Sequence, residues 1–181
     1  MTVGTLNIPV LETERLILRG WREDDVEAIR AITTDEEAAR YIGGLKEPWQ
    51  AFRSVCTQIG HWQLRGFGFF AVEEKATGQC LGWAGCWRPD GWPENEIGYS
   101  LRRSAWGKGF ATEAAEAALR WAYETLGWET AISCIDPDNV GSQGVAKRLG
   151  ATLEESGVQV CFFTADIWRH LPPKQYLERA A

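Results

Sequence analysis

The N-terminal part of the chain predicts a short strand followed by two helices. Residues 15–19 place branched apolar side chains between charged ones, as a short strand does. Residues 22–33 then carry apolar side chains at helical spacing, and a second helical stretch begins after Pro48. We expect the apolar face of this second stretch to cover a sheet. The residues near that face are Trp49, Phe52, Cys56, Ile59 and Gln63.

The middle of the chain carries strand-like runs and predicts an antiparallel meander. Three strand candidates are separated by the turn-like segments KATG and RPDGWPE. These candidates span residues 68–74, 79–87 and 95–101.

The C-terminal part alternates between helices and strands. Residues 111–126 are rich in Ala, Glu and Leu and stop before Gly127, which predicts a helix. The elements expected after it are a strand at 131–135, a helix from about Ser142 to Leu149, and strands at 151–157 and 158–168. This order predicts a single α+β domain over residues 1–181, with a mixed, mostly antiparallel sheet of about seven strands and helices on both faces.

Charge and composition narrow the classes of partner. The chain has 181 residues, and 25 acidic against 19 basic residues give a net charge of −6. A general nucleic-acid binder or membrane-surface binder would need an excess of Lys and Arg on its contact face, so we expect neither partner. No apolar run is long enough to span a membrane, and the first residues lack the pattern of a secretory signal, so the expected location is cytoplasmic.

Cysteine and histidine usage argues against a metal site. The five cysteines form no C-x-x-C pair, and His61 and His170 lie far apart in the sequence. Ten tryptophans are more than a core of this size usually needs, and we expect some of them to line a pocket.

The segment after residue 101 predicts a phosphate-binding turn. A strand ends there, Gly107 and Gly109 follow, and a long helix begins, so free backbone N–H groups can converge on an anion. Arg102, Arg103 and Lys108 add positive charge around the turn. A dinucleotide fingerprint would need Gly or Ala at position 112, where Thr stands, and no P-loop pattern is present. A tight corner without a ligand remains the simple alternative.

At this point the sequence resembles the GNAT N-acetyltransferase superfamily, and most closely its ribosomal-protein N-terminal acetyltransferase-like branch. The acetyl-CoA loop of the family reads Q/R-x-x-G-x-G/A, and residues 106–111 read WGKGFA, with Trp106 in place of Gln or Arg. Three further segments match in order: LETERLILR at 11–19, EIGYSL at 96–101, and the N-x-x-S of 139–142 followed by AKRLGA.

The resemblance implies acetyl-CoA as the acetyl donor and assigns residues to it. Ser100 and Leu101 would offer main-chain hydrogen bonds to the pantetheine, and the Leu101 N–H would face the thioester oxygen. Asn139 would hydrogen-bond the pantetheine arm, although it could simply cap a helix. The residues expected to cradle or attract the pyrophosphate are Arg103, Trp106, Gly107, Lys108, Gly109, Phe110, Ala111 and Thr112.

Acetylation of an amine needs a base and an acid, and the resemblance points to Glu96 and Ser142. Glu96 matches the strand glutamate that receives the amine proton, and partial burial would raise its pKa. It could instead pair with an arginine or hold a substrate ammonium, with Glu94 as a second candidate base. Ser142 would protonate the leaving thiolate, or cap a helix. The tyrosine that many members use as the acid is replaced by Ala146.

The resulting expectation is an acetyl-CoA-dependent N-acetyltransferase that moves an acetyl group to a primary amine by direct attack in a ternary complex. The acceptor would be a protein N-terminus or a small-molecule amine. Two alternatives stay open: a catalytically silent CoA-binding sensor or interaction protein, and a protein that binds ATP through the same turn. An exposed apolar face around residues 160–168 could pair two copies as a homodimer.

Overall fold

The fold is built around one eight-stranded sheet. The structure is a computed structural model that describes residues 6–161 and 163–179. In the described chain the strand order is β1-β2-β3-β4-β5-β6-β8-β7, and the neighbouring strands pair antiparallel except β5 and β6, which run parallel. The mixed, mostly antiparallel α+β sheet is therefore confirmed, with one strand more than expected.

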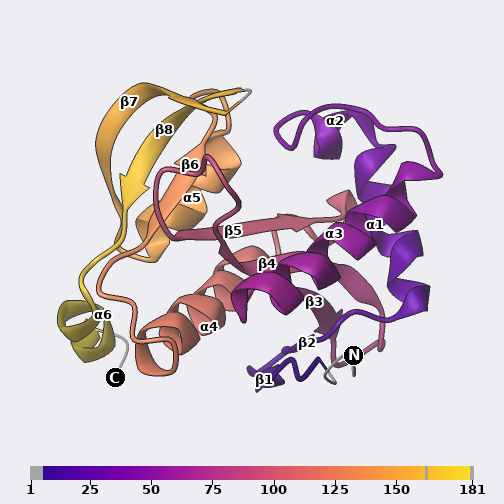
Figure 1. The fold of residues 1–181 in the computed structure, drawn as a ribbon, viewed down its shortest axis with the longest axis horizontal. Coiled ribbons are helices and arrows are strands. Elements are labelled where there is room, and N and C mark those ends of the chain that lie inside the picture. The colour runs from indigo at the N-terminus through magenta and orange to yellow at the C-terminus, as the bar shows by residue number, and fades with distance from the viewer. Residues whose placement is uncertain (1–5, 162, 180–181) are drawn as a thin grey trace.

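Short connections link the elements in chain order (Figure 1). The strands are β1 (Leu11–Glu12), β2 (Leu16–Arg19), β3 (Phe69–Glu74), β4 (Cys80–Trp87), β5 (Glu96–Leu101), β6 (Ile132–Ile135), β7 (Thr152–Val160) and β8 (Phe163–Arg169). The helices are α1 (Val26–Thr33), α2 (Glu36–Ala39), α3 (Gln50–Arg65), α4 (Phe110–Glu124), α5 (Val140–Arg148) and α6 (Pro173–Arg179), and short 3-10 turns lie at Glu23–Asp25 and Arg103–Ala105.

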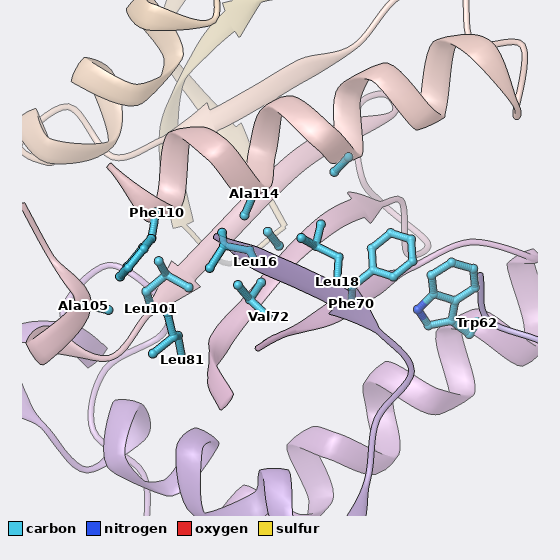
Figure 2. Packing of buried hydrophobic residues seen from close by; sticks show 12 residues of the cluster. Leu16, Leu18, Trp62, Phe70, Val72, Leu81, Leu101, Ala105, Phe110 and Ala114 are labelled. Carbon is cyan, nitrogen blue, oxygen red and sulfur yellow. The ribbon is translucent and has the colours of Figure 1, made fainter. Parts of the chain in front are cut away.

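Side chains alternate between the two faces of the sheet, and each face packs against its own layer of helices. On one face Phe70, Val72 and Leu101 pack with Ala114 and Ala118 of α4, as Figure 2 shows for most of this cluster. On the other face Trp83 packs with the cluster that α1 and α3 form. Since residues one apart on a strand point to opposite faces, the same alternation decides which site residues share a face.

The face that α3 buries differs from the predicted one. The buried residues of α3 are Ala51, Val55, His61 and Trp62, whereas Trp49 is 59% exposed and Phe52 is 57% exposed. The Trp62 indole N–H donates to the Phe69 carbonyl at 2.9 Å, and this buried bond sets the rotation of the helix. The expected face of Trp49, Phe52, Cys56 and Ile59 therefore points away from the sheet.

The C-terminal hairpin turns later than expected. The positive φ of 69° at Gly157 lies at a register shift within β7, where a bulge can form, and the turn follows β7 at Cys161, with φ 48°. The expected exposed apolar face is also wrong, because Val160, Ala165 and Ile167 are buried with Ile132. Phe162 lies outside the described residues.

No helix in the described parts of the chain combines the length and apolarity that crossing a membrane requires.

Phe70 gives a direct test of the packing under α4. Its ring is fully buried and meets Trp62 and Trp121 edge-on, with centroid distances of 4.9 and 5.4 Å. We expect Phe70→Ala to lower the free energy of unfolding by about 3–5 kcal/mol, because the cavity cannot collapse fully. Urea unfolding measures this, and Leu64→Ala, at a side chain 84% exposed, should change it by less than about 0.5 kcal/mol. Equal effects of the two substitutions would contradict the described core.

Candidate active site

The parallel strands β5 and β6 part after a single registered pair. Glu96 lies opposite Ile132, and the Ile132 N–H donates to the Asn95 carbonyl at 2.9 Å. Side chains then bond the backbone groups next along the strands: the Ser133 hydroxyl donates to the Ile97 carbonyl at 2.6 Å, and the Cys134 N–H donates to the Glu96 carboxylate at 3.1 Å. The backbone groups thus remain paired while the ladder between β5 and β6 stops.

A buried histidine completes this junction. His170 Nε2 lies 3.0 Å from Ser133 Oγ, and because the hydroxyl proton points to the Ile97 carbonyl, the imidazole N–H donates to the serine. Burial lowers the pKa of His170 to about 4, so the ring is neutral at physiological pH. Its Nδ1 has no hydrogen-bond partner in the described parts of the chain. The chain of bonds fixes where the strands separate.

Glu96 lies at the point where the strands part. The residue is 7% exposed, and its second carboxylate oxygen accepts the indole N–H of Trp92. Burial raises the pKa of Glu96 to about 7, while the bonds from Cys134 and Trp92 partly oppose the shift. No ion pair joins Glu96 to an arginine among the residues that the structure describes. A buried carboxylate that changes charge near neutral pH can accept a proton from an amine.

Glu94, the second candidate, is held in a different environment. Both of its carboxylate oxygens accept from the Arg169 guanidinium at 2.7 Å. This ion pair lowers the pKa of Glu94. Its carboxylate therefore stays charged and paired, which suits a base poorly.

Ser142 bonds to a tyrosine that the sequence did not single out. The Ser142 hydroxyl donates to Tyr99 Oη at 3.0 Å, and the Tyr99 hydroxyl donates to the Ser142 carbonyl at 3.0 Å. Burial raises the pKa of Tyr99, so the phenol keeps its proton. Tyr99 packs on the α4 side with Ile97, whereas Glu96 points to the opposite face. Strand alternation alone could not reveal that its hydroxyl meets α5.

Asn139, rather than Ser142, caps α5. Its side-chain oxygen accepts the Ser142 N–H at 3.0 Å. The capping role considered for Asn139 is thus present, and the amide nitrogen of the same side chain is a second polar group at this helix start.

The glycine turn leaves its outer side open. Gly107 and Gly109 have φ values of 73° and 81°, and a Cβ added at Gly107 would meet no atom within 4 Å. The inner side is held by Arg15, which donates to the Lys108 carbonyl at 2.9 Å and to Glu113 in the first turn of α4 at 2.7 Å. Backbone N–H groups at the start of α4 therefore face open space, an arrangement that fits the phosphates of acetyl-CoA.

The other predicted cofactor residues have varied surroundings. The Trp106 indole N–H donates to the Leu101 carbonyl at 2.7 Å, and that oxygen keeps a second lone pair for a pantetheine amide. Arg103 is paired with Asp35 and Glu37 at 3.3 and 3.0 Å, which reduces its charge toward a phosphate. Phe110 is buried in the core, so only its backbone can contribute. Ser100, Ala111 and Thr112 are half-buried.

The tryptophans divide between packing and surface. Trp62 is in the core, and Trp87 stacks on His61 and Phe69, with centroid distances of 4.2 and 4.8 Å. Trp92 alone among the described tryptophans hydrogen-bonds Glu96. The described residues include no group of three or more His, Cys, Asp or Glu side chains that could hold a metal ion.

The described residues thus combine a parted strand pair, a buried carboxylate and an open glycine turn before a helix. Residues 15–152 match the model of the acetyltransferase (GNAT) domain, and the chain belongs to this family. A Bacillus licheniformis relative, "uncharacterized N-acetyltransferase p20", is 32% identical over 138 residues, which cover 73% of this chain and 76% of the relative.

Solved structures share the fold over almost the whole chain. The acetyltransferase from Agrobacterium tumefaciens str. C58 is 32% identical with a TM-score of 0.82, covering 91% of this chain and 95% of that one. RimL, a ribosomal L7/L12 alpha-N-protein acetyltransferase in complex with coenzyme A, shares the fold at 17% identity, with a TM-score of 0.71 and coverage of 90% and 96%. The domain match confirms the resemblance to the GNAT superfamily.

The raised pKa of Glu96 predicts how stability depends on pH. Between about pH 4.5 and 7 the native carboxyl holds a proton that the unfolded chain releases, so stability from this group falls as pH rises. Between pH 5 and pH 8 the free energy of unfolding of Glu96→Gln should therefore rise, relative to that of the wild type, by up to about 3 kcal/mol. Urea unfolding at both pH values measures the change.

The matched control for this measurement is Glu94→Gln. The pKa of Glu94 is lowered, so its stabilising contribution is lost only as pH falls toward the acid range. No such gain between pH 5 and 8 should appear in the control, and the same trend in both variants would argue against a raised pKa at Glu96.

Proposed function

We propose that the protein is an acetyl-CoA-dependent N-acetyltransferase that acetylates a primary amine by direct attack in a ternary complex. The observation that carries this proposal is the position of Glu96, a buried carboxylate of raised pKa at the parting of β5 and β6. Family membership supports acetyl transfer, and the acceptor class proposed is a protein N-terminus or a small-molecule amine. Acetyl-CoA supplies the thioester when it is bound.

The base in this proposal is Glu96. An ammonium ion has no lone pair, so the acceptor must lose a proton before it attacks a carbonyl. With a pKa of about 7, Glu96 is partly ionised at neutral pH and can take this proton directly or through water. Trp92 and Cys134 hold both carboxylate oxygens in place. A positioned base of this kind contributes about 10²–10⁴ in rate.

The acid in this proposal is Ser142 together with Tyr99. The serine hydroxyl, which donates to Tyr99 in the structure, would turn to give its proton to the departing thiolate. The Tyr99 hydroxyl would then turn from the Ser142 carbonyl to the serine oxygen and replace that proton. Tyr99 thus takes the role for which the family uses a helix tyrosine, where this chain has Ala146. The Leu101 N–H would stabilise charge that develops on the thioester oxygen, an effect of about 3 kcal/mol for one donor.

The residues proposed to hold the donor lie between the end of β5 and the start of α5. The main chain of Ser100 and Leu101 and the side chain of Asn139 would bind the pantetheine arm. The backbone from Trp106 to Thr112, with Lys108 beside it, would bind the pyrophosphate. Arg103 acts at most weakly, because its charge is already paired with two carboxylates.

The second candidate is a CoA-binding protein without catalysis. Two departures from the family pattern favour it: Trp106 stands in place of Gln or Arg, and Ala146 stands in place of the helix tyrosine. Release of free thiol from acetyl-CoA distinguishes the two candidates when amino acids, polyamines, aminoglycosides and N-terminal peptides serve as acceptors. Turnover on any of them excludes the silent protein, whereas CoA binding without turnover on all of them favours it.

The pH dependence of the reaction tests the base. We expect kcat/KM to rise with pH through a midpoint near 7, because Glu96 must be ionised in the free enzyme. Glu96→Gln should lower kcat by about 10²-fold or more and remove this limb. Trp92→Phe should move the midpoint to higher pH, because the indole N–H that lowers the pKa of Glu96 is lost. An unchanged limb in Glu96→Gln would exclude Glu96 as the base.

A pair of glycine substitutions tests the turn. Gly107 and Gly127 have φ values of 73° and 67°, and a Cβ at either position meets no atom within 4 Å. Both Gly→Trp substitutions therefore carry similar backbone strain. Only Gly107→Trp should weaken acetyl-CoA binding, by about tenfold or more in calorimetry, because its side chain covers the open N–H groups. Equal affinities in the two variants would place the phosphates elsewhere.

A further inference from the structure

A small recess lies beside the glycine turn, between α4, α5 and α6. Its volume is about 140 Å³, which is below the range of pockets for drug-sized ligands and suits a small group. The residues that line it are Thr112, Glu116, Arg148, Leu149, Tyr176 and Arg179. Thr112 belongs both to this lining and to the first turn of α4, so the recess adjoins the proposed pyrophosphate site.

The two arginines in the recess differ in how they are held. Arg179 donates to the Arg148 carbonyl at 3.1 Å and packs against Gly150, so it is fixed at the end of α5. The guanidinium of Arg148 has no hydrogen-bond or ion-pair partner within residues 6–161 and 163–179. It lies over Gly144, where an added Cβ would come within 3.6 Å of it, and so points back along α5.

The charge of the recess favours an anion. Arg148 and Arg179 outweigh Glu116, and Lys108 on the adjoining turn has no side-chain partner in the described residues either. An unpaired guanidinium presents a fork of N–H donors that matches a phosphate group. These features point to a phosphate monoester held next to a pyrophosphate.

We propose that this recess binds the 3′-phosphate of the CoA ribose, with Arg148 as the residue that selects CoA over dephospho-CoA. The inference rests on the proposed acetyl-CoA-dependent function, because it needs the pyrophosphate at the glycine turn. Arg179 positions the wall of the recess, and Glu116 limits the affinity by its like charge. The adenine needs no contact in the recess, whose volume suits only the phosphate.

Calorimetry on the full chain tests the subsite, with CoA and dephospho-CoA as the two ligands. Wild type should bind CoA at least about tenfold more tightly at low salt, because charge-assisted bonds to the 3′-phosphate form only with CoA. Arg148→Gln should remove this difference by weakening CoA alone, and Arg148→Lys should keep part of it. Glu116→Gln should increase the difference.

Lys174→Gln is the matched control, since it removes the same charge from α6 at a residue outside the lining of the recess. It should leave the ratio of the two affinities unchanged, and thermal unfolding verifies that each variant is folded. Equal affinities in wild type, or an equal loss for both ligands in Arg148→Gln, would overturn the subsite but leave the transferase proposal intact. Absence of binding by either ligand would overturn both.

Discussion

The site depends on the parting of β5 from β6. Two parallel strands would normally continue their hydrogen bonds, and here the Glu96 carboxylate and the Ser133 hydroxyl bond the groups next along the strands. Each backbone group at the junction therefore keeps a partner, so the separation carries little cost in unpaired polar atoms. The same interaction that opens the sheet also desolvates Glu96 and raises its pKa.

The helix α4 ties the turn to the rest of the sheet. Its apolar side packs on β2, β3 and β5, and its first turn is anchored from the turn between β1 and β2, where the Thr13 hydroxyl donates to Glu113 at 2.6 Å. Glu113 also accepts from Arg15, which supports the Lys108 carbonyl. The turn is consequently fixed on its inner side by residues far away in the sequence, while its outer side stays open.

Features that depend on local chemistry could be predicted from the sequence. The meander, α4 and the glycine turn follow from strand patterning, helix formers and positions with positive φ. The face of α3 could not be predicted, because a tertiary contact, the bond from Trp62 to the Phe69 carbonyl on β3, overrides the more apolar stripe. Tyr99 was missed for the same reason: its contact with Ser142 joins β5 to α5 across 43 residues. Very short elements such as β1 and α2 contain too few residues to show a period in the hydrophobic pattern of the sequence.

The sheet also divides the two proton-handling groups, because Glu96 points to one face and the Tyr99–Ser142 pair lies on the other. In the proposed reaction each turnover leaves Glu96 with an extra proton and the Tyr99–Ser142 pair short of one. No bond in the described chain connects the two, so each must be restored by solvent on its own side of the sheet. The enzyme is then regenerated by two separate proton exchanges with water. A buffer that reaches one face of the sheet need not exchange protons with the group on the other face.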